Sequence, residues 1–180
     1  MRCTKYRYCV LTAFHVVNDT STVFLARTEN ESKEQELELI NGSTTYDWAV
    51  LKFRNPRYHP RNTARIGRSS WMMRGSMVYT MGSCVYGNYW MNGPQVLHTD
   101  VKKPEGLLAG AMASINEFHP KVLLPATPIY GGYSGGPMLN ERGEIVGINI
   151  AFSKIPERPE VAFVGSPIDD IIKAAKIIKR

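Results

Sequence analysis

Cysteine is scarce in this sequence, whose 180 residues include Cys3, Cys9 and Cys84 and no others. An odd number does not suit a framework of disulfides. On one extended segment Cys3 and Cys9 would lie roughly 20 Å apart, at about 3.3 Å per residue, whereas a disulfide needs α-carbons within about 7 Å. We therefore predict that these two do not pair, which favours a reducing compartment without deciding it. No zinc-site spacing occurs, so no metal is expected.

Long apolar runs are also missing. No stretch reaches the roughly 18 apolar residues of a membrane-spanning helix, so we expect no membrane insertion. Residues 1–5 lack the apolar core of a signal peptide, so either the protein is not exported or this sequence begins downstream of the natural start. Hydrophobic residues still make up 43% of the chain, enough for one packed domain or two small fused barrels.

Positive charge is in excess, and the charged residues are unevenly distributed along the chain. The net charge is +6; residues 54–74 hold six arginines and no acid, and residues 29–38 hold five glutamates and one lysine. A basic stretch can bind nucleic acid. These arginines show no helical period and accompany no RNA-binding or zinc-finger motif, so we favour a solvated loop and expect no specific nucleic-acid partner.

Short apolar segments rich in Val, Ile, Tyr and Phe recur between Gly, Asn, Pro and Ser residues, which indicates an all-β protein of sandwich or barrel type. The predicted strands are Tyr6–Thr12, Thr22–Arg27, Glu36–Ile40, Trp48–Phe53, Met77–Met81, Gln95–Val101, Lys121–Leu124, Glu144–Phe152 and Glu160–Val164.

One amphipathic helix is expected at the end, over Pro167–Lys179. Ser166 suits its N-cap, Pro167 its first position, and two aspartates its positive first turn. Isoleucines recur at three- and four-residue intervals, which predicts a helix packed on the β-structure by one apolar stripe.

Two segments place an ionisable side chain, a histidine or an aspartate, at the end of an apolar strand. Leu11–Val17 reads LTAFHVV, so an apolar strand runs into His15, a side chain that can accept and return a proton near neutral pH. Asp47–Phe53 reads DWAVLKF and places an acid where a strand begins. Taken alone, each pattern is more often structural, as in a turn aspartate.

The third motif is more specific. Gly131–Pro137 reads GGYSGGP and surrounds Ser134 with glycines. A serine hydroxyl becomes a nucleophile when a base removes its proton, and the reaction needs backbone N–H groups aimed at the developing oxyanion. Glycines allow the tight turn that this requires.

Gly132–Gly136 also satisfies the G-x-S-x-G turn of α/β-hydrolases, which would indicate an esterase. That turn leads into a helix, whereas Gly135, Gly136 and Pro137 interrupt one. Its triad histidine follows the serine in the chain, whereas all four histidines here precede Ser134. The order His, Asp, Ser is that of the chymotrypsin arrangement.

Together the three motifs resemble the signatures of trypsin-like serine peptidases, and most closely those of the HtrA (Deg) group. The stretches Ile66–Ser70, Val78–Ser83, Gly143–Asn149 and Ala162–Pro167 are similar to further parts of that domain. The resemblance implies a double β-barrel in one domain over 1–180: a first barrel over about 1–65, a second over about 66–165, and a C-terminal helix over 166–180. It also implies a site in the cleft between the barrels.

The resemblance assigns roles to individual residues. His15 would be the general base, Asp47 would orient it, and Ser134 would be the nucleophile. The backbone N–H groups of Gly132 and Ser134 would form the oxyanion hole. The residues expected to line the primary pocket carry no acid, so we expect cleavage after small or medium apolar residues; they are Thr127, Pro128, Ile150, Ala151 and Phe152.

The sequence also departs from the family pattern. The Gly-Ser-Gly strand that usually precedes the histidine strand is absent, so the first barrel would lack a strand and expose an edge. Tyr133 replaces the usual Asp or Asn, so we expect no activation by a newly released N-terminus. No PDZ-type module follows Arg180, which suggests a bare protease domain or part of a longer chain.

The predicted function is that of a serine endopeptidase, which acts without a cofactor on unfolded or flexible protein segments. The alternative is an inactive protease fold used for binding, which the presence of all three residue types disfavours. A third possibility, weak charge-driven nucleic-acid binding through Arg54–Arg74, would vanish at moderate salt. The sequence leaves the oligomeric state and the compartment open.

Overall fold

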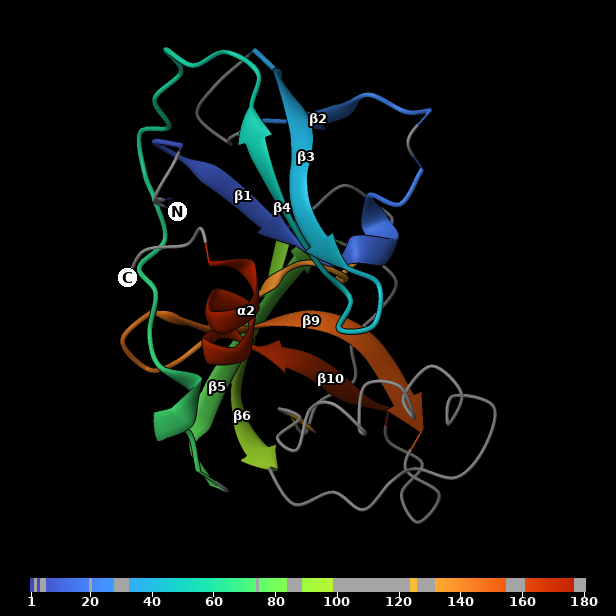
Figure 1. The fold of residues 1–180 in the computed structure, drawn as a ribbon. Coiled ribbons are helices and arrows are strands. Elements are labelled where there is room, and N and C mark those ends of the chain that lie inside the picture. The colour runs from blue at the N-terminus through green and yellow to red at the C-terminus, as the bar shows by residue number, and fades with distance from the viewer. Residues whose placement is uncertain are drawn as a thin grey trace.

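A computed structural model shows a mostly β-strand molecule with two antiparallel sheets and one C-terminal helix (Figure 1). Side chains are not described for 89–98, 124–125, 151–154 and 161–164. The residues that the structure describes are Met1, Cys3, 6–19, 21–27, 33–73, 75–83, 89–98, 124–125, 132–154 and 161–176.

The first sheet lies in the upper half of Figure 1 and has the strand order β1-β4-β3-β2. Its strands are β1 (Cys9–Thr12), β2 (Phe24–Ala26), β3 (Gln35–Ser43) and β4 (Trp48–Phe53). The first four residues of β4 are all buried, as expected for an apolar run between two packed faces. This central strand therefore anchors the turn before it, which carries Asp47.

The second sheet lies below it and has the order β10-β9-β8-β5-β6-β7. In β5 every second residue is buried, which is the period-two pattern of a strand with one face in the core. The six strands are β5 (Met77–Ser83), β6 (Tyr89–His98), β7 (Leu124–Pro125), β8 (Pro137–Leu139), β9 (Ile145–Lys154) and β10 (Val161–Pro167). The Ser134 turn leads directly into β8.

The helix α2 (Ile168–Ala175) connects the two halves. Its buried residues Ile168 and Ile171 belong to a core cluster that also contains Val50 of the first sheet and Ile148 of the second. The Asn41 side-chain amide of β3 donates to the last helical carbonyl at 3.1 Å, which satisfies one open helix-end acceptor. Among the described helices, none combines the length and apolarity needed to cross a bilayer.

The helix is shorter than predicted. It begins at Ile168 with Pro167 at the N-cap, and Lys176 ends it in the left-handed conformation with φ 55°; residues 177–180 lie outside the described part. Ser166, the predicted N-cap, is instead buried at the end of β10. The serine therefore completes a strand before the helix starts, and its side chain makes no helix cap.

Several strand boundaries also differ. β1 starts at Cys9, not at Tyr6, while β3 extends to Ser43 and β5 to Ser83. The predicted strand near residues 95–101 is the longer β6, and 99–101 lie outside the described residues. Three described elements were not predicted at all: β8, which is three residues long, and two 3-10 turns, η1 (Phe14–Val16) over His15 and η2 (Ser69–Trp71).

The prediction that Cys3 and Cys9 cannot pair is wrong. A disulfide joins them, with α-carbons 6.1 Å apart. The chain does not run extended between them: Tyr6 and Arg7 form a bend, and the Cys9 N–H donates to the Met1 carbonyl at 2.9 Å. Because the segment doubles back, the two cysteines lie much closer together than they would on an extended segment.

Candidate active site

His15 lies where β1 ends and the chain turns into η1. The turn is closed by backbone bonds from Val16 to Ala13 at 3.3 Å and from Val17 to Phe14 at 2.9 Å. Phe14 packs where Gly42 of β3 leaves room, since a Cβ there would lie 2.7 Å from its ring. This packing directs the next side chain outward, and the His15 side chain is 45% exposed.

Asp47 uses both carboxylate oxygens to hold His15. Oδ2 lies 2.6 Å from the imidazole Nδ1, and Oδ1 accepts the His15 backbone N–H at 2.8 Å. An ionised carboxylate only accepts hydrogen bonds, so Nδ1 must carry the proton and a neutral ring keeps its lone pair on Nε2. Asp47 has φ 49°, a left-handed conformation that Asp and Asn adopt more readily than most residues. The turn is therefore shaped to present this carboxylate.

Ser134 sits exposed on a tight glycine turn before β8. Gly132 and Gly135 have φ values of 103° and 80°, which side chains rarely allow. The turn is closed by the Gly136 N–H, which donates to the Tyr133 carbonyl at 2.9 Å. Tyr133 is 3% exposed and packs over Gly82 of β5, so the residue before the serine is fixed in the hydrophobic core of the second sheet.

The serine turn rests against the segment that leads to His15. A Cβ on Gly135 would overlap the Thr12 side-chain oxygen and would lie 2.9 Å from the Ala13 nitrogen. Within the described residues the structure records no hydrogen bond between the Ser134 hydroxyl and the His15 ring. The fold thus pairs His15 with Asp47 and seats the Ser134 turn beside their strand; such contacts often tighten only when substrate binds.

Asn149 of β9 is a residue that the sequence analysis missed. Its backbone accepts from Gly135 at 2.7 Å and donates to Gly136 at 2.8 Å. Its side-chain amide donates to the Met81 carbonyl of β5 at 3.3 Å, and the buried side-chain oxygen has no hydrogen-bond partner among the described residues. Asn149 therefore joins the serine turn to two strands. The one signal for it was a polar residue inside the apolar run Ile145–Phe152.

Replacement of Gly135 by alanine tests this seating. We expect Gly135→Ala to lower the free energy of unfolding by about 2 to 5 kcal/mol, the sum of left-handed strain and a steric clash with Thr12. Gly143→Ala is the control, because Gly143 has a similar φ of 69° and open space around its Cβ. Urea unfolding should show a larger loss of unfolding free energy for Gly135→Ala than for Gly143→Ala. Addition of Thr12→Ala to Gly135→Ala should restore part of that loss. Equal losses at the two glycines would contradict the contact.

The residues predicted to line a primary pocket are only partly described. Ile150 is 3% exposed and packs in the core cluster shared by the two sheets. Ala151 and Phe152 continue β9, with side chains outside the described part, and Thr127 and Pro128 lie outside it altogether. The assignment of these five residues therefore stays a prediction.

Two antiparallel sheets, with a His–Asp pair at the end of one and a serine turn before a strand of the other, are an arrangement of the trypsin-like fold. The sequence model of the trypsin-like peptidase domain matches residues 3–148, and the chain belongs to this family.

Individual proteins are also similar to it. A putative protease, Do-like 14 of Arabidopsis thaliana, is 27% identical over 177 residues, which are 95% of this chain and 38% of the relative. The HtrA-type protease AlgW, solved with a decapeptide, superposes with a TM-score of 0.70 at 18% identity over 93% of this chain and 47% of that chain. The chain thus spans less than half the length of either protein, and the structural likeness confirms the predicted fold.

Proposed function

We propose that this chain is a serine endopeptidase that hydrolyses peptide bonds through an acyl-enzyme, with His15, Asp47 and Ser134 as its catalytic residues. The observation that carries the proposal is the Asp47 carboxylate, which binds both the backbone and the ring of His15 at 2.8 and 2.6 Å. An aspartate that only stabilised a turn would not be expected to hold an exposed imidazole by two hydrogen bonds. The serine turn seated beside Thr12 supplies the nucleophile.

In the first half of the proposed reaction, the Ser134 oxygen forms a bond to the substrate carbonyl carbon while its proton passes to His15 Nε2. Negative charge moves onto the carbonyl oxygen, which the N–H groups of Gly132 and Ser134 stabilise. When the carbonyl re-forms, the C–N bond breaks and the imidazolium returns its proton to the leaving amine. Asp47 stabilises the charged ring throughout.

In the second half, water replaces the amine. His15 accepts a proton from the water as its oxygen attacks the ester carbon, and then returns that proton to the Ser134 oxygen as the acyl bond breaks. All atoms balance without a cofactor. We propose flexible peptide segments as substrates, with cleavage after small or medium apolar residues; AlgW, the structural neighbour, was solved with a bound peptide.

Covalent labelling tests the proposal directly. A fluorinated alkyl phosphonate should add one phosphonyl group per chain, and peptide mass spectrometry should place it on Ser134, because the reagent needs an activated hydroxyl. Ser134→Ala should remain unlabelled, while the exposed Ser70 should never be modified in either protein. A folded wild-type protein that takes up no reagent would instead favour a protease fold used only for binding.

A further inference from the structure

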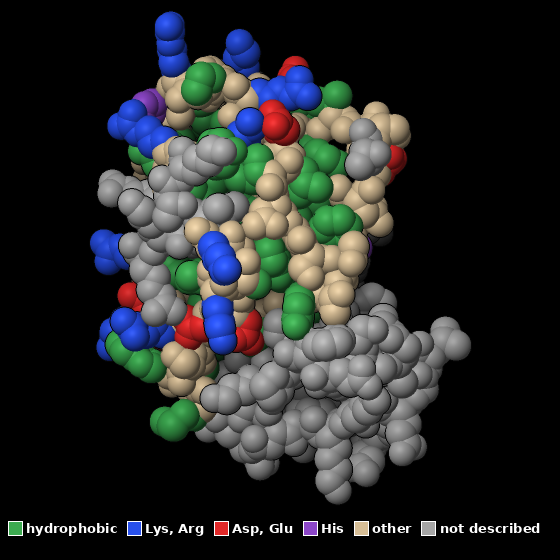
Figure 2. Space-filling view, in the orientation of Figure 1, with side chains coloured by type: hydrophobic (Ala, Val, Ile, Leu, Met, Phe, Trp, Pro, Cys, Tyr) green, Lys and Arg blue, Asp and Glu red, His purple; other side chains and the backbone are tan. Residues whose placement is uncertain are grey.

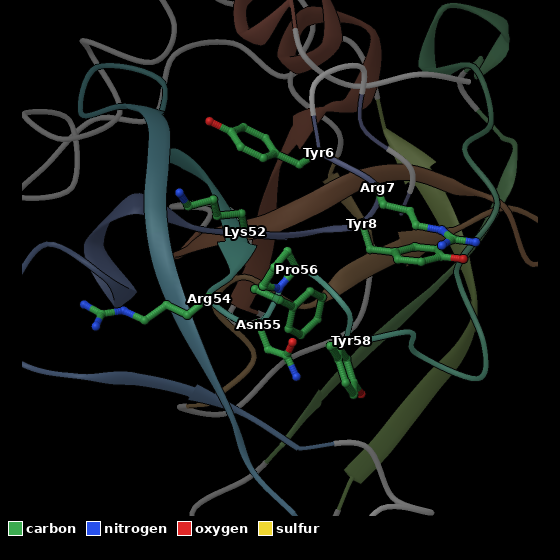
Figure 3. A pocket seen from close by; sticks show the side chains of 9 residues that line it. Tyr6, Arg7, Tyr8, Lys52, Arg54, Asn55, Pro56 and Tyr58 are labelled. Atoms are coloured by element: carbon green, nitrogen blue, oxygen red, sulfur yellow. The ribbon is translucent and has the colours of Figure 1, made fainter.

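A pocket of about 380 Å³ (Figure 3) lies at the C-terminal end of β4, whereas Asp47 precedes the start of that strand. β4 starts beside Asp47, and Lys52 follows five residues later, about 17 Å away at 3.3 Å per strand residue. Cys9 pairs with Lys52 in the β1–β4 register, so the residues before β1 reach the same end. The pocket is thus separate from the candidate active site, yet connected to it by one rigid strand.

Among the described residues that line this pocket, three are cations and none is an acid. Lys52 and Arg54 lie on one side, and Arg7 lies beside Tyr8 on the other (Figure 3). In Figure 2, Lys and Arg side chains gather over this end of the first sheet. The pocket therefore presents positive charge from two separate chain segments, which suits an anionic ligand.

The cations are held in place. The Arg7 Nη1 lies 2.7 Å from His59 Nε2, which accepts the bond because arginine only donates, and the guanidinium lies 5.8 Å from the Tyr8 ring centre. The Lys52 ammonium lies 5.3 Å from the Tyr6 ring centre. Such ordering lowers the entropy lost when a ligand binds.

Two of these cations form ion pairs with described acids of β3. Glu38 pairs with Lys52 at 3.1 Å, and Glu36 pairs with Arg54 at 3.6 Å. The Glu36 and Arg54 side chains are 54% and 61% exposed, so this ion pair contributes little and can be exchanged at small cost. A carboxylate from another molecule can therefore share or replace these contacts.

We infer that this pocket is an exosite for acidic polypeptide segments, and that it recruits protein substrates whose acidic stretch lies away from the cleaved bond; the recruiting role rests on the proposed peptidase function. The aromatic rings favour a peptide over single-stranded nucleic acid. Base stacking needs open ring faces, whereas Tyr8 is engaged by Arg7 and His59, and Phe53 packs against Tyr58 at 4.6 Å. A carboxylate needs only the cations.

The experiment measures binding without cleavage, in the full chain with Ser134→Ala. The protein is titrated into a short fluorescent peptide of alternating glutamate and serine, and binding is measured by fluorescence anisotropy. The same titration is made with a peptide in which glutamine replaces each glutamate. We expect the acidic peptide to bind at least about fivefold more tightly, and Arg7→Gln with Lys52→Gln to remove that preference. The matched control, Arg142→Gln with Lys173→Gln, removes the same charge from exposed positions of the second half and should leave binding unchanged.

Three results would overturn the exosite: equal binding of both peptides, equal losses in the two double variants, or tighter binding of an oligothymidylate of the same charge. If the Arg7/Lys52 double variant unfolds at a lower temperature than wild type, Arg54→Gln at an exposed position provides the same comparison, with a smaller loss of the preference for the acidic peptide. Phosphonate labelling of the Arg7/Lys52 variant that retains Ser134 should match that of wild type. Failure of labelling in both the wild type and this variant would reject the peptidase proposal, while the anisotropy result would still decide the binding site.

Discussion

Ser134→Ala is expected to lower kcat on an unfolded protein substrate by at least about 10⁴-fold, with the fold unchanged. Without the hydroxyl no acyl-enzyme can form, and His15 has no serine proton to remove. The residual rate would come from direct attack by water beside His15 and from any oxyanion stabilisation that the turn still provides. Release of fluorescence from a heavily labelled, unfolded casein measures the effect.

The control for this change is Ser70→Ala. Ser70 is exposed, and its bond to Asp169 at 2.7 Å is made by the backbone nitrogen, so alanine preserves it. This variant should cleave the substrate at the wild-type rate. If Ser134→Ala retained more than about a tenth of the activity, the nucleophile would have to be another group, and the proposed mechanism would fail.

Much of the fold could be predicted from the sequence because its signals are local. The buried run of β4 and the alternating pattern of β5 are visible in the residues themselves. β8 was missed because it has three residues and begins with a proline, which gives too short a pattern to read. Its strand character comes from pairing with β5 and β9, which no local signal records.

The disulfide shows the same limit. The prediction treated Cys3 and Cys9 as parts of one extended segment, next to a strand expected over Tyr6–Thr12. In the structure the segment bends at Tyr6 and Arg7, and Cys3 packs in the same core cluster as Ile168 of the helix. The bend is stabilised by tertiary packing with residues far along the chain, so spacing alone could not reveal the pair.

For the candidate site, the sequence supplied residue types and order but not geometry. The resemblance named His15 and Asp47, whereas the left-handed backbone of Asp47 and its second bond to the His15 nitrogen are visible only in the structure. Asn149 was missed because its role depends on facing the serine turn from a neighbouring strand.

Asp47→Asn is the second large effect, because this variant should keep the structure and lose the reaction. Asparagine tolerates the left-handed backbone of position 47. Its carbonyl oxygen would keep accepting the His15 backbone N–H, which places the amide NH₂ where Oδ2 now meets the ring at 2.6 Å. An NH₂ group donates, so Nδ1 would have to accept and the ring proton would move to Nε2.

With its proton on Nε2, the imidazole presents a donor to Ser134 and can no longer remove the hydroxyl proton. We expect kcat to fall by about 10⁴-fold, with substrate affinity and thermal unfolding close to wild type. Asp47→Ala is the contrast: it loses both bonds and gains left-handed strain of about 1 to 2 kcal/mol, so it should lose stability as well as rate. Nitrogen-15 NMR of the histidine ring reads the tautomer directly. An Asp47→Asn protein with near wild-type turnover, or with the proton still on Nδ1, would show that the carboxylate does not set the state of the base.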